Sequence, residues 1–247
     1  MRDYKKLAET IYSRKSSREY DDTSTELLEG DPDLMQVFSV ETLVDDIKVA
    51  VRVLRDRQVK NDRSNYCLAF YSEDKPRYLE NIGFIGQQIE LELQAEGLGT
   101  CWWGMKKPSK EYKSHNGLDC VITMSAGVPK AVEKRAYPDG FKRNNADEIM
   151  IGNALPDRLI EAVRIAPSAV NLQPWLIEKS DHDYSFYLRQ PKGIMEKLIG
   201  SMRHIDMGIA IAHFFVQAKA NGLNLSFDFN GNNREKALFI AKITLDA

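Results

Sequence analysis

Hydrophobic and polar positions alternate along several stretches of the chain with the two-residue period of a β-strand. In the stretch IKVAVRVLR, for example, aliphatic residues share one face, and Lys48 and Arg52 share the other. Alternating or continuously apolar runs of this kind predict strands over residues 47–55, 65–72, 120–129, 175–179, 184–188 and 237–245. Short polar turns join the first two strands and also the fourth and fifth, so we expect two β-hairpins.

Other stretches carry apolar residues at the three- and four-residue spacing of an amphipathic α-helix. This spacing predicts helices over residues 3–14, 76–96, 156–166 and 204–221. The second helix has the clearest limits, because Pro76 suits a first turn and Gly97 suits a C-terminal stop. We expect His204 and Asp206 to cap the start of the last helix. Two charged stretches are expected to be irregular: residues 22–38, apart from one short helix, and residues 130–150.

The two longest predicted helices share a pattern of small residues. Four residues of the first match residues 125 positions later in the second: Gly83 with Gly208, Ala95 with Ala220, Gly97 with Gly222 and Leu98 with Leu223. Each helix follows a predicted hairpin and ends in A-x-G-L. Chance agreement between small residues is the plainer explanation, but the matching order of elements favours an internal duplication. Two helices with smooth glycine faces would then pack together as in an isologous dimer.

Composition and charge exclude several classes of protein. With 247 residues, of which 43% are hydrophobic and 28% charged, the chain can bury a sizeable core. The formal net charge of −2, from 34 basic and 36 acidic residues, gives no support for nucleic-acid binding. No run of 18 apolar residues predicts a membrane span, and the N-terminus lacks the apolar segment of a secretory signal. We therefore expect a cytoplasmic protein with no nucleic-acid or membrane partner.

Common catalytic and metal-binding motifs do not occur. Cys67, Cys101 and Cys120 are widely spaced and odd in number, which suggests free thiols in a reducing compartment. Hydrolase, zinc and P-loop motifs are missing, so we expect neither a metal nor a catalytic side chain. The stretch GLGTCWWG at residues 97–104 lacks the third glycine of a dinucleotide-binding loop and follows a helix. His213 lies in an apolar helix, where a satisfied core imidazole is the more common role.

Two polar motifs remain. RKSSREY, at residues 14–20, gathers cations and hydroxyl groups at the end of a predicted helix, which suits a phosphate. For this segment alone, a solvated basic helix end is the plainer interpretation. APSAVNLQPW, at residues 166–175, ends a helix at Pro167 and then offers Ser168 and the amide of Asn171, which suit the edge of a polar ring. A simple turn would not need Asn, Gln, Pro and Trp together.

Together, these motifs resemble those of the flavin-dependent nitroreductase family. Its members open with R-R/K-S-x-R-x-F/Y, matched at residues 14–20, and carry A-P-S-x-x-N-x-Q-P-W, matched in full at residues 166–175. The family's G-L-G-T-x-W-x-G is matched at residues 97–104, its G-x-P at residues 127–129, and its basic pair at Lys142–Arg143. The resemblance covers most of the chain.

The order of the motifs differs from that of an ordinary member. In ordinary members the second motif follows the first by a few dozen residues, and two subunits build each flavin site together. Here the two motifs lie about 150 residues apart, and each half of the chain carries only one of them. The resemblance therefore implies a single-chain, internally duplicated version of the nitroreductase fold. This is an α+β fold with mainly antiparallel sheets flanked by helices. We expect one globular unit over residues 1–247, with repeats at 1–140 and 141–247.

The resemblance also implies one surviving FMN site between the halves of a monomer. Residues expected around the FMN phosphate are Arg14, Lys15, Ser16, Lys142 and Arg143. Residues expected along the opposite side are Pro167, Ser168, Ala169 and Asn171. The backbone of Trp103 and Gly104 is expected near the reactive edge of the ring, where N–H groups stabilise negative charge on reduced flavin.

The activity implied is hydride transfer from NADH or NADPH through FMN to a nitroaromatic, a quinone or a similar small molecule. One alternative keeps the fold and changes the reaction to dehalogenation, flavin cleavage or ene reduction, since fold alone does not decide function. The other alternative is a non-catalytic flavin-binding protein whose ring is covered by residues 21–38 or 130–150.

Overall fold

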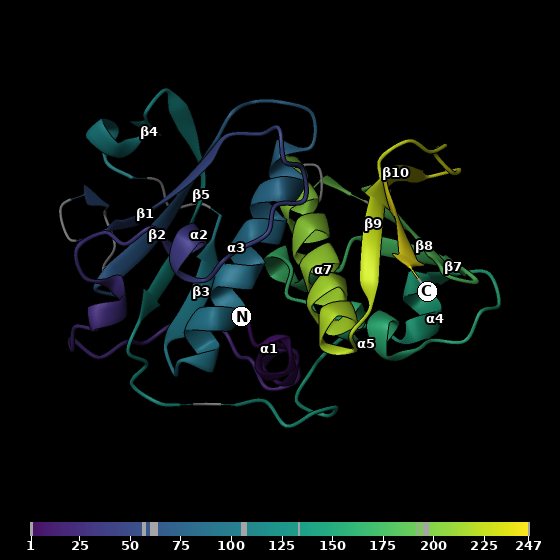
Figure 1. Cartoon of the computed structure of the whole chain (residues 1–247), viewed down its shortest axis with the longest axis horizontal. Helices are drawn as coiled ribbons and strands as arrows, with labels where there is room; N and C mark the ends of the chain where they lie inside the picture. Colours follow the sequence, from purple (N-terminus) through teal and green to yellow (C-terminus); the bar gives the residue numbers. More distant parts are fainter. Residues whose placement is uncertain are drawn as a thin grey trace.

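Two mainly antiparallel sheets stand on either side of a central pair of long helices (Figure 1). The computed structural model describes residues 2–55, 58–59, 64–104, 108–132, 134–191, 193–194 and 198–246. The architecture is α+β, as the hydrophobic pattern predicts.

All the predicted helices and strands are present among these residues. The first half contributes α1 (Tyr4–Ile11), η1 (Glu26–Leu28), α2 (Leu34–Val37), β1 (Val49–Leu54), β2 (Tyr66–Ser72), α3 (Tyr78–Ala95), β3 (Gly99–Trp103), η3 (Lys110–Tyr112), β4 (Ser114–His115) and β5 (Leu118–Gly127). The second half contributes α4 (Ala146–Ile149), β6 (Met150–Ile151), α5 (Arg158–Arg164), η4 (Ala169–Asn171), β7 (Trp175–Ser180), β8 (Asp183–Arg189), α7 (Gly200–Ala220), β9 (Asn224–Asp228) and β10 (Ala237–Asp246). Most of the polar turn expected between β1 and β2 lies outside the described residues.

Two features differ from the expectations. The strands β3 and β9 are not among the predicted strands, and each pairs with a long neighbouring strand, β5 or β10. The expected cap of the last helix is wrong: α7 begins at Gly200, so His204 and Asp206 lie inside the helix. The apolar periodicity begins only at Ile205, and the first turn of the helix therefore carries no periodic signal.

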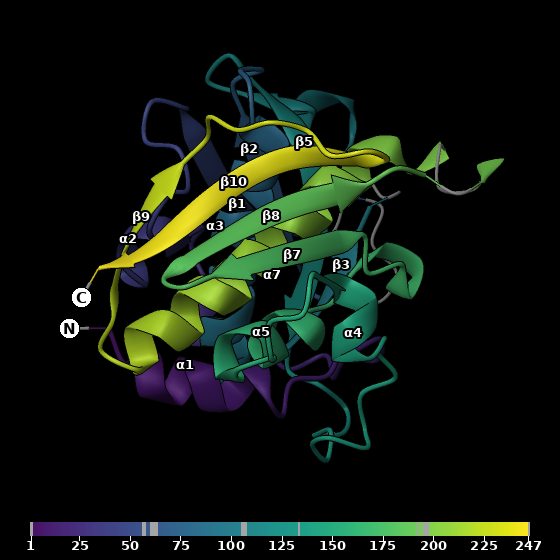
Figure 2. The same ribbon diagram turned by 90° about the vertical axis from the view of Figure 1, so that its right-hand side faces the viewer.

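The two sheets repeat one pattern of connections. In the first sheet the strand order is β1-β2-β5-β3, and α3 leads from β2 to β3. In the second sheet the order is β7-β8-β10-β9, and α7 leads from β8 to β9. The short strand β4 pairs with β5, and β6 pairs in parallel with β7. Figure 2 shows the second sheet lying across the outer face of α7, with α5 and α1 beneath it.

The central helices α3 and α7 approach each other closely at two glycines. A Cβ atom on Gly83 would collide with the carbonyl oxygen of Ile205, and one on Gly208 would collide with that of Glu80. Residues 80 and 205 are 125 positions apart, as are residues 83 and 208. The two contacts are therefore reciprocal, which is the geometry of a self-complementary interface within one chain.

The largest hydrophobic cluster runs through both halves. It joins buried residues of the first sheet, the helix pair and the second sheet, such as Phe70, Phe84, Phe214 and Phe186. The amphipathic α1 buries Leu7 and Ile11 and packs against both α3 and α7. The N-terminal segment that follows α1 is thereby held at the junction of the halves, where the site lies.

Candidate functional site

A cavity of about 180 Å³ lies between the two halves, and we call it the interhalf pocket. It is lined by Ser16, Arg18, Cys101, Trp102, Gly104 and Ile122 from the first half and by Pro167, Ser168, Ala169, Val170, Met202, Ile205, Asp206 and Ile209 from the second. The three segments that carry the sequence motifs therefore meet at one cavity, although the first and last of them are about 150 residues apart in the chain.

Only part of the predicted site lines this pocket. Five predicted residues do so: Ser16, Gly104, Pro167, Ser168 and Ala169. The others stand behind or beside the lining, namely Arg14, Lys15, Trp103, Lys142, Arg143 and Asn171. The segment GLGTCWWG, at residues 97–104, contains two tryptophans. Trp102, rather than the predicted Trp103, lines the pocket.

Arg14 is turned into the interior. Its Nη2 atom lies 3.0 Å from Oε1 of Glu90, and both side chains are fully buried. The same Nη2 donates to Oγ of Ser16 at 3.0 Å. Nε and Nη1 of Arg14 have no hydrogen-bond partner within the described structure. Because buried donors without partners are costly, these two N–H groups favour an added acceptor such as an anion or water.

Glu90 ties the N-terminal segment to β3. Besides Arg14, its Oε1 accepts from Nε2 of Gln94 at 3.1 Å and from Oγ1 of Thr100 at 3.2 Å. Its Oε2 accepts from the indole N–H of Trp102 at 3.1 Å. One buried carboxylate thus orients both Ser16, through Arg14, and a tryptophan of the pocket lining.

The tryptophan begins a chain of hydrogen bonds across the helix pair. Trp102 also donates to Oε1 of Gln87 at 3.2 Å, and Nε2 of Gln87 lies 3.2 Å from Nε2 of His213. Nδ1 of His213 lies 2.9 Å from the carbonyl oxygen of Ala162 on α5. Burial lowers the pKa of His213 to about 3, so the ring is neutral and donates through Nδ1. His213 is a satisfied core imidazole, as its place in an apolar helix predicts.

Four arginines are close enough to repel one another, namely Arg14, Arg18, Arg135 and Arg143, and Arg18 among them lines the pocket. Burial and the charges of Arg14 and Arg18 lower the pKa of Arg135. Burial and the charges of Arg135 and Arg14 lower the pKa of Arg143 to about 10. Guanidinium groups that repel one another in a partly desolvated place are stabilised by an anion. The cluster therefore favours a phosphate at this end of the site.

Arg143 holds the turn that forms the second-half wall. Its Nε donates to the carbonyl oxygen of Ala166 at 3.0 Å, and its Nη1 donates to Oδ1 of Asn171 at 2.7 Å. The amide nitrogen of Asn171 donates in turn to the carbonyl oxygen of Lys142 at 3.0 Å. The predicted basic pair and the predicted asparagine therefore bind each other, and the amide of Asn171 is not among the groups that line the pocket.

The same turn is held in an unusual conformation. Val170 has φ of 48° and Asn171 has φ of 59°, both in the left-handed region that a β-branched valine rarely adopts. The side chain of Val170 is 76% exposed and lines the pocket. Such strain persists only where surrounding contacts fix it, and it is common at binding sites.

Asp206 supplies one of those contacts from α7. Its Oδ1 and Oδ2 accept from the backbone N–H of Ala169 at 3.0 and 3.2 Å. The side chain is buried within the pocket wall, and burial raises its pKa to about 7. The residue 125 positions earlier, Asn81, makes the equivalent bond: its Oδ1 accepts from the N–H of Val44 at 3.2 Å.

Two further cavities adjoin the interhalf pocket. One, of about 260 Å³, shares Ser16 and Arg18 with it and adds Lys15 and Lys130, so it extends the basic end. The other, of about 830 Å³, is more open and shares Gly104 and Met202. The pocket is thus placed between a basic recess and a wide vestibule.

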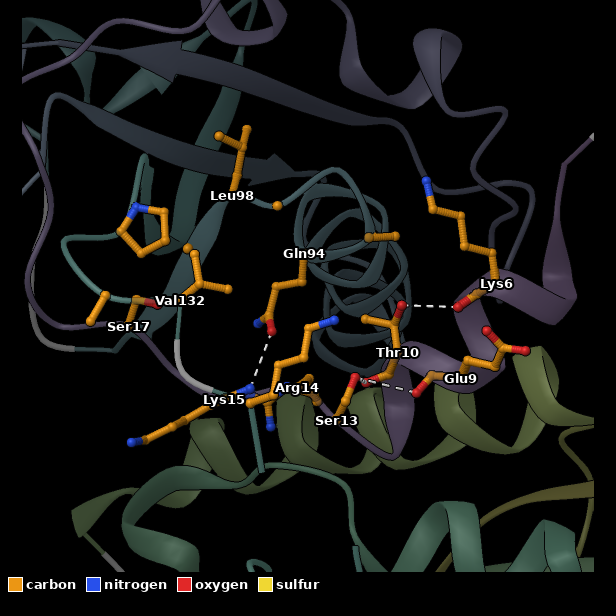
Figure 3. Close-up of a pocket in the computed structure, with 16 residues that line it drawn as sticks. Lys6, Glu9, Thr10, Ser13, Arg14, Lys15, Ser17, Gln94, Leu98 and Val132 are labelled. Atoms are coloured by element: carbon orange, nitrogen blue, oxygen red, sulfur yellow. Dashed lines mark hydrogen bonds between the residues drawn. The ribbon is translucent and has the colours of Figure 1, made fainter. Parts of the chain in front are cut away.

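A fourth cavity, of about 370 Å³, lies between α1 and the C-terminal end of α3 (Figure 3). Its polar groups are largely paired: Oγ1 of Thr10 donates to the carbonyl oxygen of Lys6, and the backbone N–H of Lys15 donates to Oε1 of Gln94. All its lining residues come from the first half. It therefore brings no second-half motif to a ligand, and the interhalf pocket is the candidate site.

Sequence reasoning missed most of the apolar lining. The missed residues are Arg18, Cys101, Trp102, Ile122, Val170, Met202, Ile205, Asp206 and Ile209. Four of them lie within the motifs, namely Arg18, Cys101, Trp102 and Val170, and Asp206 stands at the repeat position of Asn81. Ile122, Met202, Ile205 and Ile209 lie outside the motifs, and the local sequence does not show that they meet at one pocket.

Other kinds of site find little support. Over the part of the chain that the structure describes, no group of three or more His, Cys, Asp or Glu residues is placed to hold a metal ion. Cys67, Cys101 and Cys120 form no disulfide bonds in the described structure. None of the helices described is long and apolar enough to cross a membrane.

The chain is similar to known proteins over most of its length. A family model described as "Putative TM nitroreductase" matches residues 6–218. A protein of the same description from Thermotoga maritima has 19% sequence identity and a TM-score of 0.65, and the match covers 97% of this chain and 93% of that one. At this identity the similarity demonstrates a shared fold.

Two other solved structures match less of the chain. An FMN-dependent nitroreductase from Clostridium difficile has 16% identity and a TM-score of 0.43, with 59% of this chain and 98% of that chain covered. An iodotyrosine deiodinase, solved with FMN and 3-iodo-L-tyrosine, has 16% identity and a TM-score of 0.41, with 61% and 99% covered. No curated protein matches the chain.

Proposed function

This chain belongs to the TM nitroreductase family, and from that premise we propose that the interhalf pocket binds FMN and that the protein is an oxidoreductase. One observation carries the proposal: the three segments with nitroreductase-like motifs line a single cavity. The expected hydride donor is NADH or NADPH, and the expected acceptor is a nitroaromatic, a quinone or a similar small molecule.

The residues present fit a flavin mononucleotide. A flat ring needs apolar walls, which Ile122, Ile205 and Ile209 supply. A phosphate needs cations and N–H donors; Arg18 supplies them from the pocket lining, and buried Arg14 orients Ser16 of the same lining. The mutual repulsion within the arginine cluster, which lowers the pKa of Arg135 and Arg143, would be relieved by the same phosphate.

The role of the protein is to bind and orient. Bound FMN supplies the two-electron transfer, so the chain needs no catalytic acid or nucleophile of its own. Gly104 has no side chain, which lets Met202 lie against its backbone at the pocket wall, since a Cβ atom at position 104 would be 2.5 Å from Sδ of Met202. The vestibule beside Gly104 and Met202 gives donor and acceptor a common approach to that wall.

We also infer that the two halves arose by duplication and replace the two subunits of a dimer. The reciprocal contacts of Gly83 and Gly208, the repeated strand order and the meeting of Ser16 with residues 167–170 support this inference. The α3–α7 interface then lies inside one chain, so we expect a monomer. Light scattering of the purified protein would test that expectation.

The decisive experiment measures flavin retention. The protein is mixed with FMN, desalted and examined by absorption spectroscopy, and NADH or NADPH is then added without oxygen. We expect about one flavin per chain, bleached by the nucleotide. Absence of flavin would contradict the proposal, whereas flavin that no nicotinamide nucleotide bleaches would indicate a non-catalytic flavin-binding protein.

A variant sharpens this test. Arg18→Ala removes a cation that lines both the interhalf pocket and the basic recess. Because a charge-assisted hydrogen bond contributes about 1.5–3 kcal/mol, FMN affinity should fall about tenfold or more. The matched control is Lys242→Ala, which removes a cation from β10 of the second sheet. Equal FMN affinity in the two variants would count against a phosphate site at Arg18.

A further inference from the structure

The pocket wall contains a carboxyl group in a place where the other half of the chain uses a neutral amide. Asn81 and Asp206 are 125 positions apart. Asn81 accepts from the backbone N–H of Val44, and Asp206 accepts from that of Ala169, which is 125 positions after Val44. The amide oxygen of Asn81 additionally accepts from the N–H of Leu43 at 2.8 Å. A neutral side chain is therefore sufficient to hold this turn in place.

Retaining a carboxyl group at position 206 carries an energetic cost. Asp206 is 3% exposed, and a buried carboxylate loses the solvation that stabilises its charge. The pKa of Asp206 is accordingly raised to about 7, in spite of the Ala169 N–H and the charge of Arg203, which both act to lower it. An asparagine would hold Ala169 without this cost, so the carboxyl group has a use that pinning the turn does not explain.

The position of Asp206 indicates that use. Asn81 holds a turn of the first half, whereas Asp206 is part of the lining of the interhalf pocket. The groups around it are Arg203 on the same helix, the Ala169 N–H from the turn and, within the pocket lining, Arg18 and Cys101. The neighbouring Glu80–His204 pair joins α3 to α7, with Nδ1 and Oε1 2.7 Å apart.

We propose that Asp206 holds a proton in step with the redox state of the bound cofactor. On reduction, hydride transfer from a nicotinamide adds two electrons and one proton to FMN and leaves the pocket more negative by one charge. Asp206 then takes one proton from solvent, which restores the charge of the pocket, and its carbonyl oxygen keeps the Ala169 N–H bond. On reoxidation the hydride passes to the acceptor, and Asp206 returns its proton to the acceptor or to water.

The physical cause is repulsion between like charges. A second negative charge in the pocket raises the pKa of a carboxyl group further. Since the pKa of Asp206 is already near neutral, this increase moves the group from mostly ionised to mostly protonated at mildly alkaline pH. The inference rests on the proposed function, because it needs FMN in the interhalf pocket.

The test is the pH dependence of the reduction potential of bound FMN, measured with mediator dyes and without any substrate. Each proton taken up shifts the two-electron equilibrium tenfold per pH unit, which is about 30 mV. Between about pH 7 and 9 we expect the intact protein to take up one proton more per flavin than Asp206→Asn. The slopes should therefore be about 60 and about 30 mV per pH unit. Equal slopes in the two proteins would overturn the proposal.

The equivalent position supplies a matched control. Asn81→Asp places a carboxyl group at the same hydrogen bond in the first half, outside the interhalf pocket lining, and should leave the slope unchanged. If Asn81→Asp changed the slope as much as Asp206→Asn does, the slope would respond to the charge of the protein in general rather than to Asp206. That result would overturn the proposal.

The unmodified protein gives a second measurement that needs no variant. Asp206→Asn could fail to fold or to keep FMN. In that case, a reduction potential of the intact protein that changes by only about 30 mV per pH unit throughout pH 7–9, which is one proton per flavin, is enough to overturn the proposal. Failure of the proposed function looks different, because the intact protein then retains no FMN and has no potential to measure.

Discussion

The interhalf pocket and the equivalent place on the other side of the helix pair share a backbone framework but differ in what fills them. Positions 125 residues apart correspond: β3 to β9, Gly104 to Phe229, and Met202 to Arg77. At the pocket, Gly104 and Met202 both line the cavity, and Gly104, which has no side chain, lies against Met202. At the equivalent place, the guanidinium of Arg77 lies 4.9 Å from the centre of the Phe229 ring, and its Nη2 donates to the carbonyl oxygen of Phe229 at 2.8 Å.

The charges of the two places differ as well. The turn that faces the pocket carries Val170 and Asn171, whereas the corresponding residues of the first half are Asp45 and Asp46. Two carboxylates oppose binding of a phosphate, and an aromatic ring takes up the space that a flavin would need. We therefore expect one FMN per chain. A few side chains on a similar backbone thus decide whether a cavity forms at the place or the place is filled.

The largest expected effect comes from breaking the contact that relates the two halves. Gly208→Ala places a methyl group against the backbone oxygen of Glu80, and Gly83→Ala places one against that of Ile205. Backbone atoms in a helix pair cannot move aside cheaply, so each variant should lose about 3 kcal/mol or more of unfolding free energy. Urea unfolding measures this loss. Losses of very different size in the two variants would contradict the reciprocity of the interface.

The next largest effect concerns stability in acid. We expect it to depend on a residue of α7 and not on the equivalent residue of α3. His213 corresponds to Gln88, a neutral amide, and burial lowers the pKa of His213 to about 3. The unfolded chain binds a proton at this residue below its ordinary pKa of about 6.5, while the folded chain does not. Stability should therefore fall as pH decreases below about 6.5, by about 3 kcal/mol at pH 4.

The variant His213→Gln tests this assignment by making the two positions alike. Glutamine keeps a donor for the carbonyl oxygen of Ala162 but does not titrate. Unfolding free energies of the variant and the unmodified protein should diverge between pH 6.5 and pH 4, with the variant less sensitive to acid. Parallel pH profiles would mean that other groups cause the acid sensitivity.

The smallest expected effect comes from making the pocket resemble its filled counterpart. Gly104→Phe introduces the ring that Phe229 has at the equivalent place, and the flexible Met202 side chain can move to admit it. The fold should remain, while FMN affinity should fall about tenfold or more, or about 1.4 kcal/mol. Equilibrium FMN binding together with a thermal unfolding curve measures both. Full FMN binding by the folded variant would show that the cofactor lies away from Gly104.

The amino-acid sequence by itself determined the elements and the motifs. The hairpins β1–β2 and β7–β8 and the helices α3 and α7 follow from apolar periodicity, which depends on neighbours a few residues apart. The correspondence of Gly83 with Gly208 also follows from the printed residues, because small residues at a fixed offset need no structure to be recognised. The motifs, through their resemblance to the nitroreductase family, led us to expect Ser16, Gly104 and residues 167–169 at one site, and these residues line the interhalf pocket.

Only the tertiary structure decided where the charged and amide side chains point. Arg14 turns toward Glu90, 76 positions away, and Asn171 binds Arg143, 28 positions away, and neither is among the residues that line the interhalf pocket. Asp206, which the pattern places at a helix cap, lies in the pocket wall instead. A buried polar group takes the partner that folding brings within hydrogen-bond distance, and that choice depends on contacts between distant segments rather than on local sequence.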